Sequence, residues 1–320
     1  MASGLTHILL TKKLQDKFPD GELKNILAFA TDSFQVGAVG PDLPYASIAD
    51  FDLLNNDSPL ADKFHYKKTN QIPFEALKKL KSLRGQIDPL LHYHMFSFFL
   101  GYISHIVADG IIHPFVRDIV GDYQDNKAEH RTLEMQLDVL FFEELTKSSG
   151  FTSELNYTNI HDEIGNFLDV DGINQILQVF SDLIKTNYNE QYSVEKILRW
   201  IKGLHRMFDI AEGEHPQFYR NLKKNSFTYR NISEIDRERA LILKKPKDRN
   251  INFLKVTEID FFKDCVPQYY FRFTKVAEKA YAYVFEEGQE LEANDIPLIN
   301  LDTGRLIEND DLDLIPEFWK

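Results

Sequence analysis

The chain has 320 residues, 43% of them hydrophobic, which is enough to fill the core of one large domain or two ordinary ones. Its formal net charge of −13 disfavours broad electrostatic attraction to duplex DNA or to an anionic membrane, because both surfaces repel acidic proteins. The single cysteine, Cys265, excludes an internal disulfide framework and a cysteine-based zinc site, so a bound metal must rely on imidazole and carboxylate ligands. We expect Cys265 itself to be a core residue.

Helical periodicity dominates the chain. Apolar residues recur three and four positions apart in segments that we expect to be helices: 5–18, 22–36, 73–83, 88–112, 127–147, 172–186, 193–211 and 267–287. No convincing set of alternating strands is present, so we predict an all-α fold. The stretches GAVGPDLPY at 37–45 and KSSGFTSELNYTN at 147–159 indicate loops. The basic, irregular residues 212–266 are typical of a solvated loop region, and the alternative is a substrate-facing lip.

The N-terminus has neither the basic start nor the apolar centre of a signal peptide. We therefore expect a cytoplasmic protein, or a secreted one if a leader was removed. The most apolar stretch, residues 95–116, carries ionisable residues along one stripe. Such groups are costly in lipid, so this stretch predicts a buried core helix and no transmembrane segment.

The histidines are unevenly distributed, with seven of the ten in the first 130 residues. In SHIVADGIIHP, His105, Asp109 and His113 follow one another at intervals of four, so they share one helix face. The segment AEHRTLEMQLD repeats this spacing with His130 and Glu134, and the stripe continues to a possible supporting residue, Asp138. One stripe of this kind can serve two neighbouring metal ions.

A four-residue spacing alone is weak evidence for a metal site, because such pairs are common on solvated helices. However, His105 and Asp109 lie among apolar residues, where an unpaired carboxylate is costly. Either a cation compensates, or a buried His–Asp hydrogen bond merely orients the helix. Two features favour the cation: His7 near the start of the first helix, and Asp42 in a segment stiffened by Pro41 and Pro44.

The order of these motifs resembles the zinc-dependent phospholipase C and P1/S1 nuclease superfamily. The likeness rests on GLTHILL, GAVGPDLPY, FLGYISHIVADGIIHPFV and AEHRTLEMQLD, and it covers about residues 4–145. It is closest to the bacterial zinc-dependent phospholipase C domain that is also found in glycosylphosphatidylinositol-specific phospholipase D. The resemblance implies a multi-helix fold with a cluster of two or three zinc ions in a cleft.

The resemblance also implies which residues bind metal. The ligands would be His7, Asp42, His65, His105, Asp109, His113, His130 and Glu134. Asp42, His65 and His105 would hold one ion, and Asp42 would also be the catalytic base that helps to activate water. Asp109 would bridge two ions and His7 would serve a third, while the last three residues would form the remaining site. The N-terminal tryptophan that binds metal in the secreted bacterial enzyme has no counterpart here, so the third ion would be bound more weakly, completed by a different ligand, or absent.

His92 and His94 are alternatives to His65. On a continuous helix His94 would lie about 16 Å from His105, too far to share an ion. We therefore interpret both as ordinary histidines. The same interpretation applies to the histidines that lack a partner at a useful spacing, namely His161, His205 and His215.

The resemblance divides the chain into a metal-binding helical core, residues 1–146, and a helical extension packed on it, residues 147–320, within one continuous domain. In the extension, 271–291 is amphipathic and 299–305, INLDTGR, is typical of a turn. Whether the extension is a lid, an interface or scaffold stays open.

We expect a zinc-dependent phosphodiester hydrolase, phospholipase C-like, in which metal-activated water attacks the phosphate of a phospholipid or another phosphodiester. One alternative is a nuclease or other phosphodiesterase with the same metals, and another is a non-catalytic, metal-stabilised binding protein. We expect no stable nucleic-acid complex, and the sequence does not indicate an oligomeric state.

Overall fold

The computed structural model describes residues 4–14, 17–49, 56–148, 157–212, 228–229, 231–244, 254, 258–311 and 313–320. Most of these residues are helical, which confirms the predicted all-α fold. The α-helices are α1 (Gly4–Leu14), α2 (Glu22–Phe29), α3 (Thr31–Ala38), α4 (Ser58–Tyr66), α5 (Gln71–Leu83), α6 (Pro89–Val120), α7 (Tyr123–Ser148), α8 (Tyr157–Phe167), α9 (Ile173–Tyr188), α10 (Val194–Glu212), α11 (Arg237–Leu241) and α12 (Val266–Phe285).

The remaining elements are short. The 3-10 helices are η2 (Gly40–Ile48), η4 (Ile232–Glu234), η6 (Ala293–Asp295), η7 (Ile307–Asn309) and η8 (Glu317–Trp319), and η5 (Phe261–Cys265) is a turn of π-helix. Two strands, β1 (Ile242–Lys244) and β2 (Glu258–Asp260), pair antiparallel with Leu243 opposite Ile259.

Several boundaries differ from those predicted. The expected helix 22–36 is broken at Ala30, whose ψ of 39° leaves the helical region, into α2 and α3. The expected loop 37–45 contains the end of α3 and most of the 3-10 helix η2. In η2, Pro41 and Pro44 fix φ near helical values, and their nitrogens carry no hydrogen to donate. The sequence pattern did not predict α4 or α8. The expected solvated region 212–266 includes α11 and both strands, and much of it lies outside the described residues.

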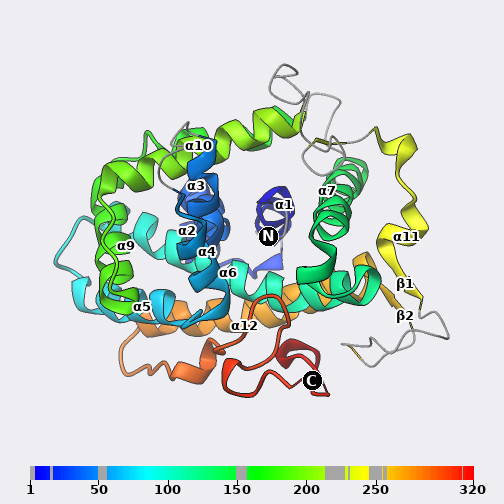
Figure 1. Cartoon of the computed structure of the whole chain (residues 1–320). Coiled ribbons are helices and arrows are strands. Elements are labelled where there is room, and N and C mark those ends of the chain that lie inside the picture. The colour runs from blue at the N-terminus through cyan, green and yellow to red at the C-terminus, as the bar shows by residue number, and fades with distance from the viewer. Residues whose placement is uncertain are drawn as a thin grey trace.

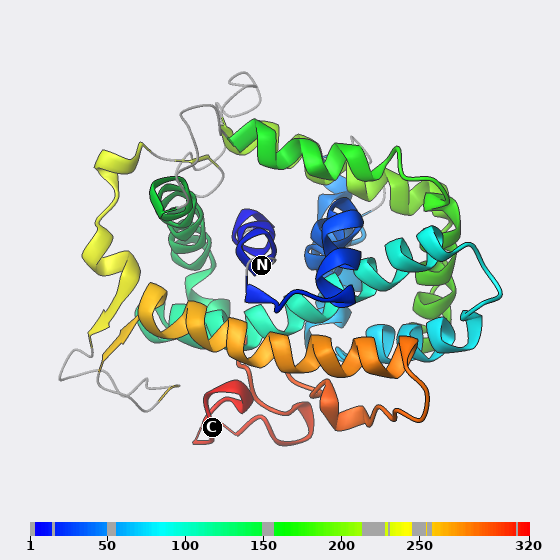
Figure 2. The same cartoon turned by 180° about the vertical axis from the view of Figure 1, so that it is seen from behind.

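Helix α6 is the centre of the fold. It contacts α1, α2, α3, α5, α7 and α12, and both views show it running through the middle of the molecule (Figures 1 and 2). Among the described residues it is the one helix long and apolar enough to cross a membrane, but its apolar window is entirely buried inside the fold. Asp88 begins α6 by accepting hydrogen bonds from the backbone N–H groups of Leu90 and Leu91. The burial of α6 agrees with the buried core helix predicted around residues 95–116.

Two glycines allow α3 to cross α6 very closely. A Cβ atom at Gly37 would lie 2.0 Å from the carbonyl oxygen of Phe98, and one at Gly101 would lie 2.2 Å from that of Phe34. Any larger residue at these positions would force the helices apart. This contact brings the end of α3, and η2 after it, against the middle of α6.

One hydrophobic cluster runs through the described chain, from Leu5 in α1 to Phe318 in η8. Cys265 is a buried free thiol within it, as the sequence predicted. In Figure 1, α1 lies between α3 and α7, α10 crosses on one side, and α12 and the C-terminal residues lie on the other. The residues after α12 therefore pack on the same core as the first helices.

Candidate metal centre

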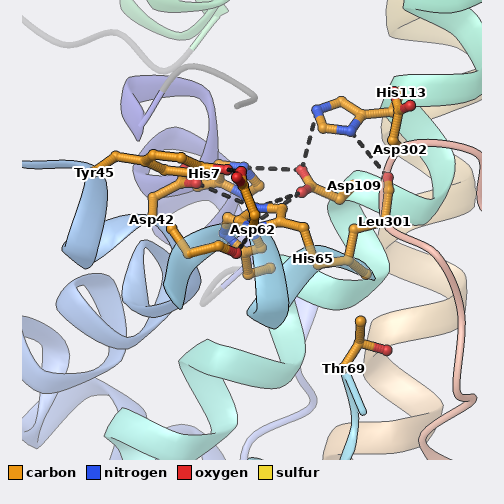
Figure 3. Close-up of polar contacts among 12 residues, drawn as sticks. His7, Asp42, Tyr45, Asp62, His65, Thr69, Asp109, His113, Leu301 and Asp302 are labelled. Atoms are coloured by element: carbon orange, nitrogen blue, oxygen red, sulfur yellow. Dashed lines mark hydrogen bonds and ion pairs between the residues drawn. The ribbon is translucent and has the colours of Figure 1, made fainter. Parts of the chain in front are cut away.

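The eight predicted ligands come together inside the fold. His7 lies on α1, Asp42 on η2, His65 on α4, His105, Asp109 and His113 on α6, and His130 and Glu134 on α7. Each is buried, with no more than 5% of its surface exposed. Figure 3 shows the part of this cluster around Asp109. Five separate elements thus contribute to one polar cluster in an apolar interior.

Asp109 is at the centre of the cluster. Its Oδ2 atom lies 3.0 Å from Nε2 of His105 and 3.7 Å from Nε2 of His65. Its Oδ1 atom lies 3.2 Å from Nε2 of His7 and 3.6 Å from Nε2 of His113 (Figure 3). The two carboxylate oxygens therefore face different imidazoles, which is the arrangement of a carboxylate that bridges two cations.

The potential ligand atoms form compact groups. Within each group they lie within 4.8 Å of one another, and the groups are His65–His105–Asp109, His113–His130–Glu134 and His7–Asp42–His105. Asp42 joins the first group through Oδ1, which is 3.2 Å from Nε2 of His65. The structure thus brings His65 next to the other predicted ligands, while Asp42 groups with His7 as well as with His65. Which of these residues bind metal stays a prediction.

Backbone carbonyl groups orient the imidazoles. Nδ1–H of His105 donates to the carbonyl oxygen of Ala38 at 2.8 Å, and Nδ1–H of His65 donates to that of Ala61 at 2.7 Å. Each ring, when neutral, then presents the lone pair of Nε2 to the cluster. These two Nε2 atoms are 3.3 Å apart, so in the neutral rings two lone pairs face each other. A cation between them would remove that repulsion.

The second group has the same character. Nδ1–H of His113 donates to the carbonyl oxygen of Leu301 at 2.9 Å, and its Nε2 lies 3.4 Å from Oε1 of Glu134. His130 approaches the same oxygen with Nε2 at 3.0 Å. One potential ligand atom from each of the three residues thus lies within 4.8 Å of the other two, as expected for ligands of one ion.

Several polar atoms of the cluster lack a hydrogen-bond partner among the described residues. They are both ring nitrogens of His7, both oxygens of Asp109, Oδ1 of Asp42, Nε2 of His113, Nδ1 of His130 and Oε2 of Glu134. Buried polar atoms are normally satisfied, and leaving one unsatisfied costs about 1–3 kcal/mol. Imidazole nitrogens and carboxylate oxygens are the donor set of cysteine-free zinc sites. The cluster therefore fits zinc.

The cluster also keeps its carboxylates ionised. Burial by itself would raise the pKa of Asp109, but the positive charges of His105 and His113 outweigh it and hold that pKa well below its usual value. Burial lowers the pKa of His113, and the charge of Asp109 raises it above its usual value overall. Negative charge is thus present at the centre at neutral pH, ready to bind a cation.

Asp138 holds the start of α1. Its Oδ1 accepts hydrogen bonds from the backbone N–H of Thr6 at 2.8 Å and from the hydroxyl of Thr6 at 2.7 Å. Thr6 precedes His7, so Asp138 supports a predicted ligand through the backbone, in line with the supporting role expected from the sequence. Burial raises the pKa of Asp138 to about 7, although the Thr6 hydroxyl opposes the shift.

A pocket lies beside the cluster. Its wall combines Asp42 and Arg131 with mostly apolar neighbours, namely Gly4, Tyr45, Met135, Leu204, Met207, Phe208, Ala211 and Tyr229. Nε of Arg131 is buried and has no hydrogen-bond partner among the described residues, and NH1 lies 3.9 Å from Oε2 of Glu134. No sequence pattern indicated Arg131, although it directly follows the predicted ligand His130.

The other histidines lie apart from the cluster. His92 contacts the carbonyl oxygen of Leu80 and His94 contacts the hydroxyl of Ser33, as expected of ordinary histidines. The two others that the structure describes have acidic partners, His161 with Glu212 and His205 with Asp209. The prediction that His205 lacks a partner at a useful spacing was wrong, because Asp209 follows it at an interval of four. That pair is partly exposed, and His215 lies outside the described residues.

Comparison with known proteins agrees with this geometry. A family model described as zinc dependent phospholipase C matches residues 6–213, which include all eight predicted ligands. The match extends beyond the resemblance recognised at 4–145 and ends just after α10. No curated protein and no solved structure matches the chain.

Proposed function

Because the chain belongs to the zinc-dependent phospholipase C family, we propose that it is a phospholipase C-like hydrolase whose substrate is a glycerophospholipid. The family match supports a zinc phosphodiesterase-type function in general. The proposed reaction adds water across the bond between phosphorus and the glycerol oxygen. The hydroxyl group goes to the phosphate and a proton goes to the glycerol oxygen, which leaves diacylglycerol and a phosphorylated head group.

The observation that carries this proposal is the placement of Asp109. Its two oxygens face His105 on one side and His7 and His113 on the other. We assign one zinc ion to Asp42, His65, His105 and Asp109, and a second to His113, His130 and Glu134. His7 and Asp109 would contribute to a third. When bound, zinc ions neutralise phosphoryl oxygens and lower the pKa of water enough to supply hydroxide near neutral pH.

Asp42 is the proposed base. It lines the pocket as well as the cluster, so its carboxylate is within reach of both a bound substrate and the metal groups. Burial would raise the pKa of Asp42, but the charges of His105 and His65 bring it below its usual value. At neutral pH Asp42 is therefore ionised and able to accept a proton from water.

Arg131 is the proposed contact for the phosphate. Its guanidinium borders the pocket. Among the described residues its nearest carboxylate partner is Glu134, whose Oε2 lies 3.9 Å from NH1. Arginine suits phosphate because its planar fork of donors matches the oxygens of the anion. Beside Arg131 the wall carries thioether, aliphatic and aromatic side chains, Met135, Leu204 and Phe208 among them.

The proposal is tested with three substrates and zinc-loaded protein. Mixed micelles of phosphatidylcholine should release diacylglycerol and phosphocholine, identified by mass spectrometry. Single-stranded DNA and bis(p-nitrophenyl) phosphate should react at least tenfold more slowly. If DNA is cleaved faster than phosphatidylcholine, the protein is a nuclease and not a phospholipase. If zinc-loaded protein cleaves none of the three substrates, the result favours a metal-stabilised binding protein.

A matched pair of variants makes this test specific. Asp109→Asn should lower turnover roughly a thousandfold, whereas Asp209→Asn should leave it unchanged. Asp209 has the same four-residue spacing to a histidine, His205, but this pair is partly exposed on α10 and outside the cluster. Equal loss in both variants would indicate general damage to the fold and would contradict the assignment of Asp109.

A further inference from the structure

A short segment near the C-terminus reaches two histidines of the metal centre. This segment, residues 299–305, lies outside the region that matches the family. The carbonyl oxygen of Leu301 accepts the Nδ1–H of His113 at 2.9 Å, and the backbone N–H of Leu301 donates to the carbonyl oxygen of His65 at 2.9 Å (Figure 3). One residue thus connects the two helices, α4 and α6, that present these imidazoles.

The segment lies tightly against α6. Gly304, at φ 68°, approaches α6 so closely that a Cβ atom there would be 2.6 Å from the carbonyl oxygen of Gly110 and 2.9 Å from Cγ of Pro114. A Cβ atom at Gly110 would in turn be 2.5 Å from Cδ1 of Ile299. Glycine is therefore needed at 304, where an added Cβ atom would meet the backbone of α6, whereas at 110 it would meet side chains of the C-terminal residues. This contact begins three residues before His113.

Polar contacts hold the segment at its start and in its middle. Asp302 pairs with Arg117 of α6, and the hydroxyl of Thr69 donates to the carbonyl oxygen of Ile299 at 2.7 Å. The turn predicted at 299–305 is present, and Ile299 forms a β-bridge with Leu306. The backbone at Leu301 is therefore fixed with respect to α6 and to the end of α4.

This contact has a chemical consequence for His113. Donation from Nδ1 to a carbonyl oxygen fixes the tautomer and the orientation of the ring, and it makes Nε2 a better ligand. Nε2 of His113 then points at Glu134 and Asp109. Partners of this kind typically change metal affinity by about 10–100-fold when they are removed.

We propose that residues 299–305 are a positioning segment of the metal centre, which sets zinc affinity through the backbone of Leu301. This inference rests on the proposed zinc cluster. It assigns a function to part of the region beyond the family match: this region completes the centre instead of serving as a separate module. The residues of this segment are positioning residues: they act on the metal centre through His113 and His65 and do not contact the substrate.

The test compares two glycine variants of the full chain. Gly304→Ala places a Cβ atom against Gly110, whereas Gly288→Ala, at φ 72°, has no atom within 4 Å of the added carbon. Both variants place a Cβ atom at a similar positive φ, so their difference isolates the contacts with α6 and with Pro316. Competition with a chelator should show zinc binding weakened about 10–100-fold by Gly304→Ala and changed less than twofold by Gly288→Ala. The visible spectrum of the cobalt-substituted protein should also change in Gly304→Ala alone, because the coordination geometry is altered.

The outcomes separate this inference from the proposed function. Wild-type protein that binds no zinc would overturn both. Wild-type protein that binds zinc, with Gly304→Ala indistinguishable from it in affinity and cobalt spectrum, would overturn only the role of the segment. If Gly304→Ala does not fold, Asp302→Asn provides the same readouts, because it removes the charged contact with Arg117 and leaves the backbone intact. Unchanged affinity and spectrum in that variant would also contradict the proposal.

Discussion

One turn of α6 separates His105 from Asp109 and brings Nε2 of the first within 3.0 Å of Oδ2 of the second. Both side chains are fully buried. A lone ion pair in such a place is weak evidence for a stabilising role, because desolvation offsets most of the attraction. Here the other oxygen of Asp109 faces His7 and His113 instead of solvent, so the pair is one edge of a larger, charge-rich centre.

Asp109→Asn should therefore affect more than one ion. The amide keeps the shape of the side chain but loses the negative charge. In the proposed assignment that charge is shared by the ion at His65 and His105 and by the third ion at His7. We expect zinc content to fall by more than one equivalent and turnover to fall roughly a thousandfold, since metal catalysis is worth several kcal/mol. Elemental mass spectrometry and a turnover assay check this. Loss of only one equivalent would contradict the bridging role.

Arg131→Gln should lower kcat/KM for the phosphodiester by about 10–100-fold, because a charged hydrogen bond to the phosphate is lost. Zinc content should not change, since Arg131 is not a ligand. Arg239→Gln is the matched control, because Arg239 also pairs weakly with a glutamate, Glu129 at 3.8 Å, but is mostly exposed. A fall in kcat/KM of the same size in both variants would count against a phosphate contact.

The helical ligands were predictable because an α-helix fixes the relation between its own residues. The interval of four between His105, Asp109 and His113 places them on one face whatever the rest of the chain does. The same holds for His130 and Glu134 on α7. His65 is different, because no spacing relates it to the others, and only the family resemblance indicated it before the structure placed it 3.2 Å from Asp42.

The groups that orient the ligands could not be predicted from the sequence. The carbonyl oxygens of Ala38, Ala61 and Leu301 act through the backbone, which has no residue-specific signature. Their positions depend on tertiary packing, such as the close crossing of α3 and α6 at Gly37 and Gly101. Glycines in a sequence indicate freedom of the backbone, but they do not indicate which element will pack against them.

Asp138 should make the stability of the fold depend on pH. Its pKa rises from 3.8 in the unfolded chain to about 7 in the fold, mainly because it is buried. The folded state then holds a proton that the unfolded state has lost, so the free energy of unfolding falls as pH rises from about 4 to 7, by roughly 4 kcal/mol. Asp138→Asn should remove this fall, because an amide does not titrate. Chemical denaturation of chelator-treated protein at several pH values checks this, and parallel curves for the two proteins would contradict it.

Removing zinc should destabilise the protein. The metal-free cluster leaves carboxylate oxygens and imidazole nitrogens buried without hydrogen-bond partners among the described residues, Asp109 and His7 among them. Zinc binds the folded state far better than the unfolded one, so an excess of roughly 1,000 times the Kd should add about 4 kcal/mol per site. Thermal unfolding with and without chelator checks this, and Mg²⁺ serves as the control cation because it prefers oxygen ligands. Equal melting temperatures in zinc and chelator would argue against a zinc site in the core.

An anomalous difference map from crystals of the full chain, collected on both sides of the zinc absorption edge, would show directly whether zinc occupies the cluster. We predict two or three peaks inside the cluster, one enclosed by His65, His105 and Asp109 and another by His113, His130 and Glu134. Zinc-soaked crystals with no anomalous peak among these residues would rule out the proposed zinc cluster.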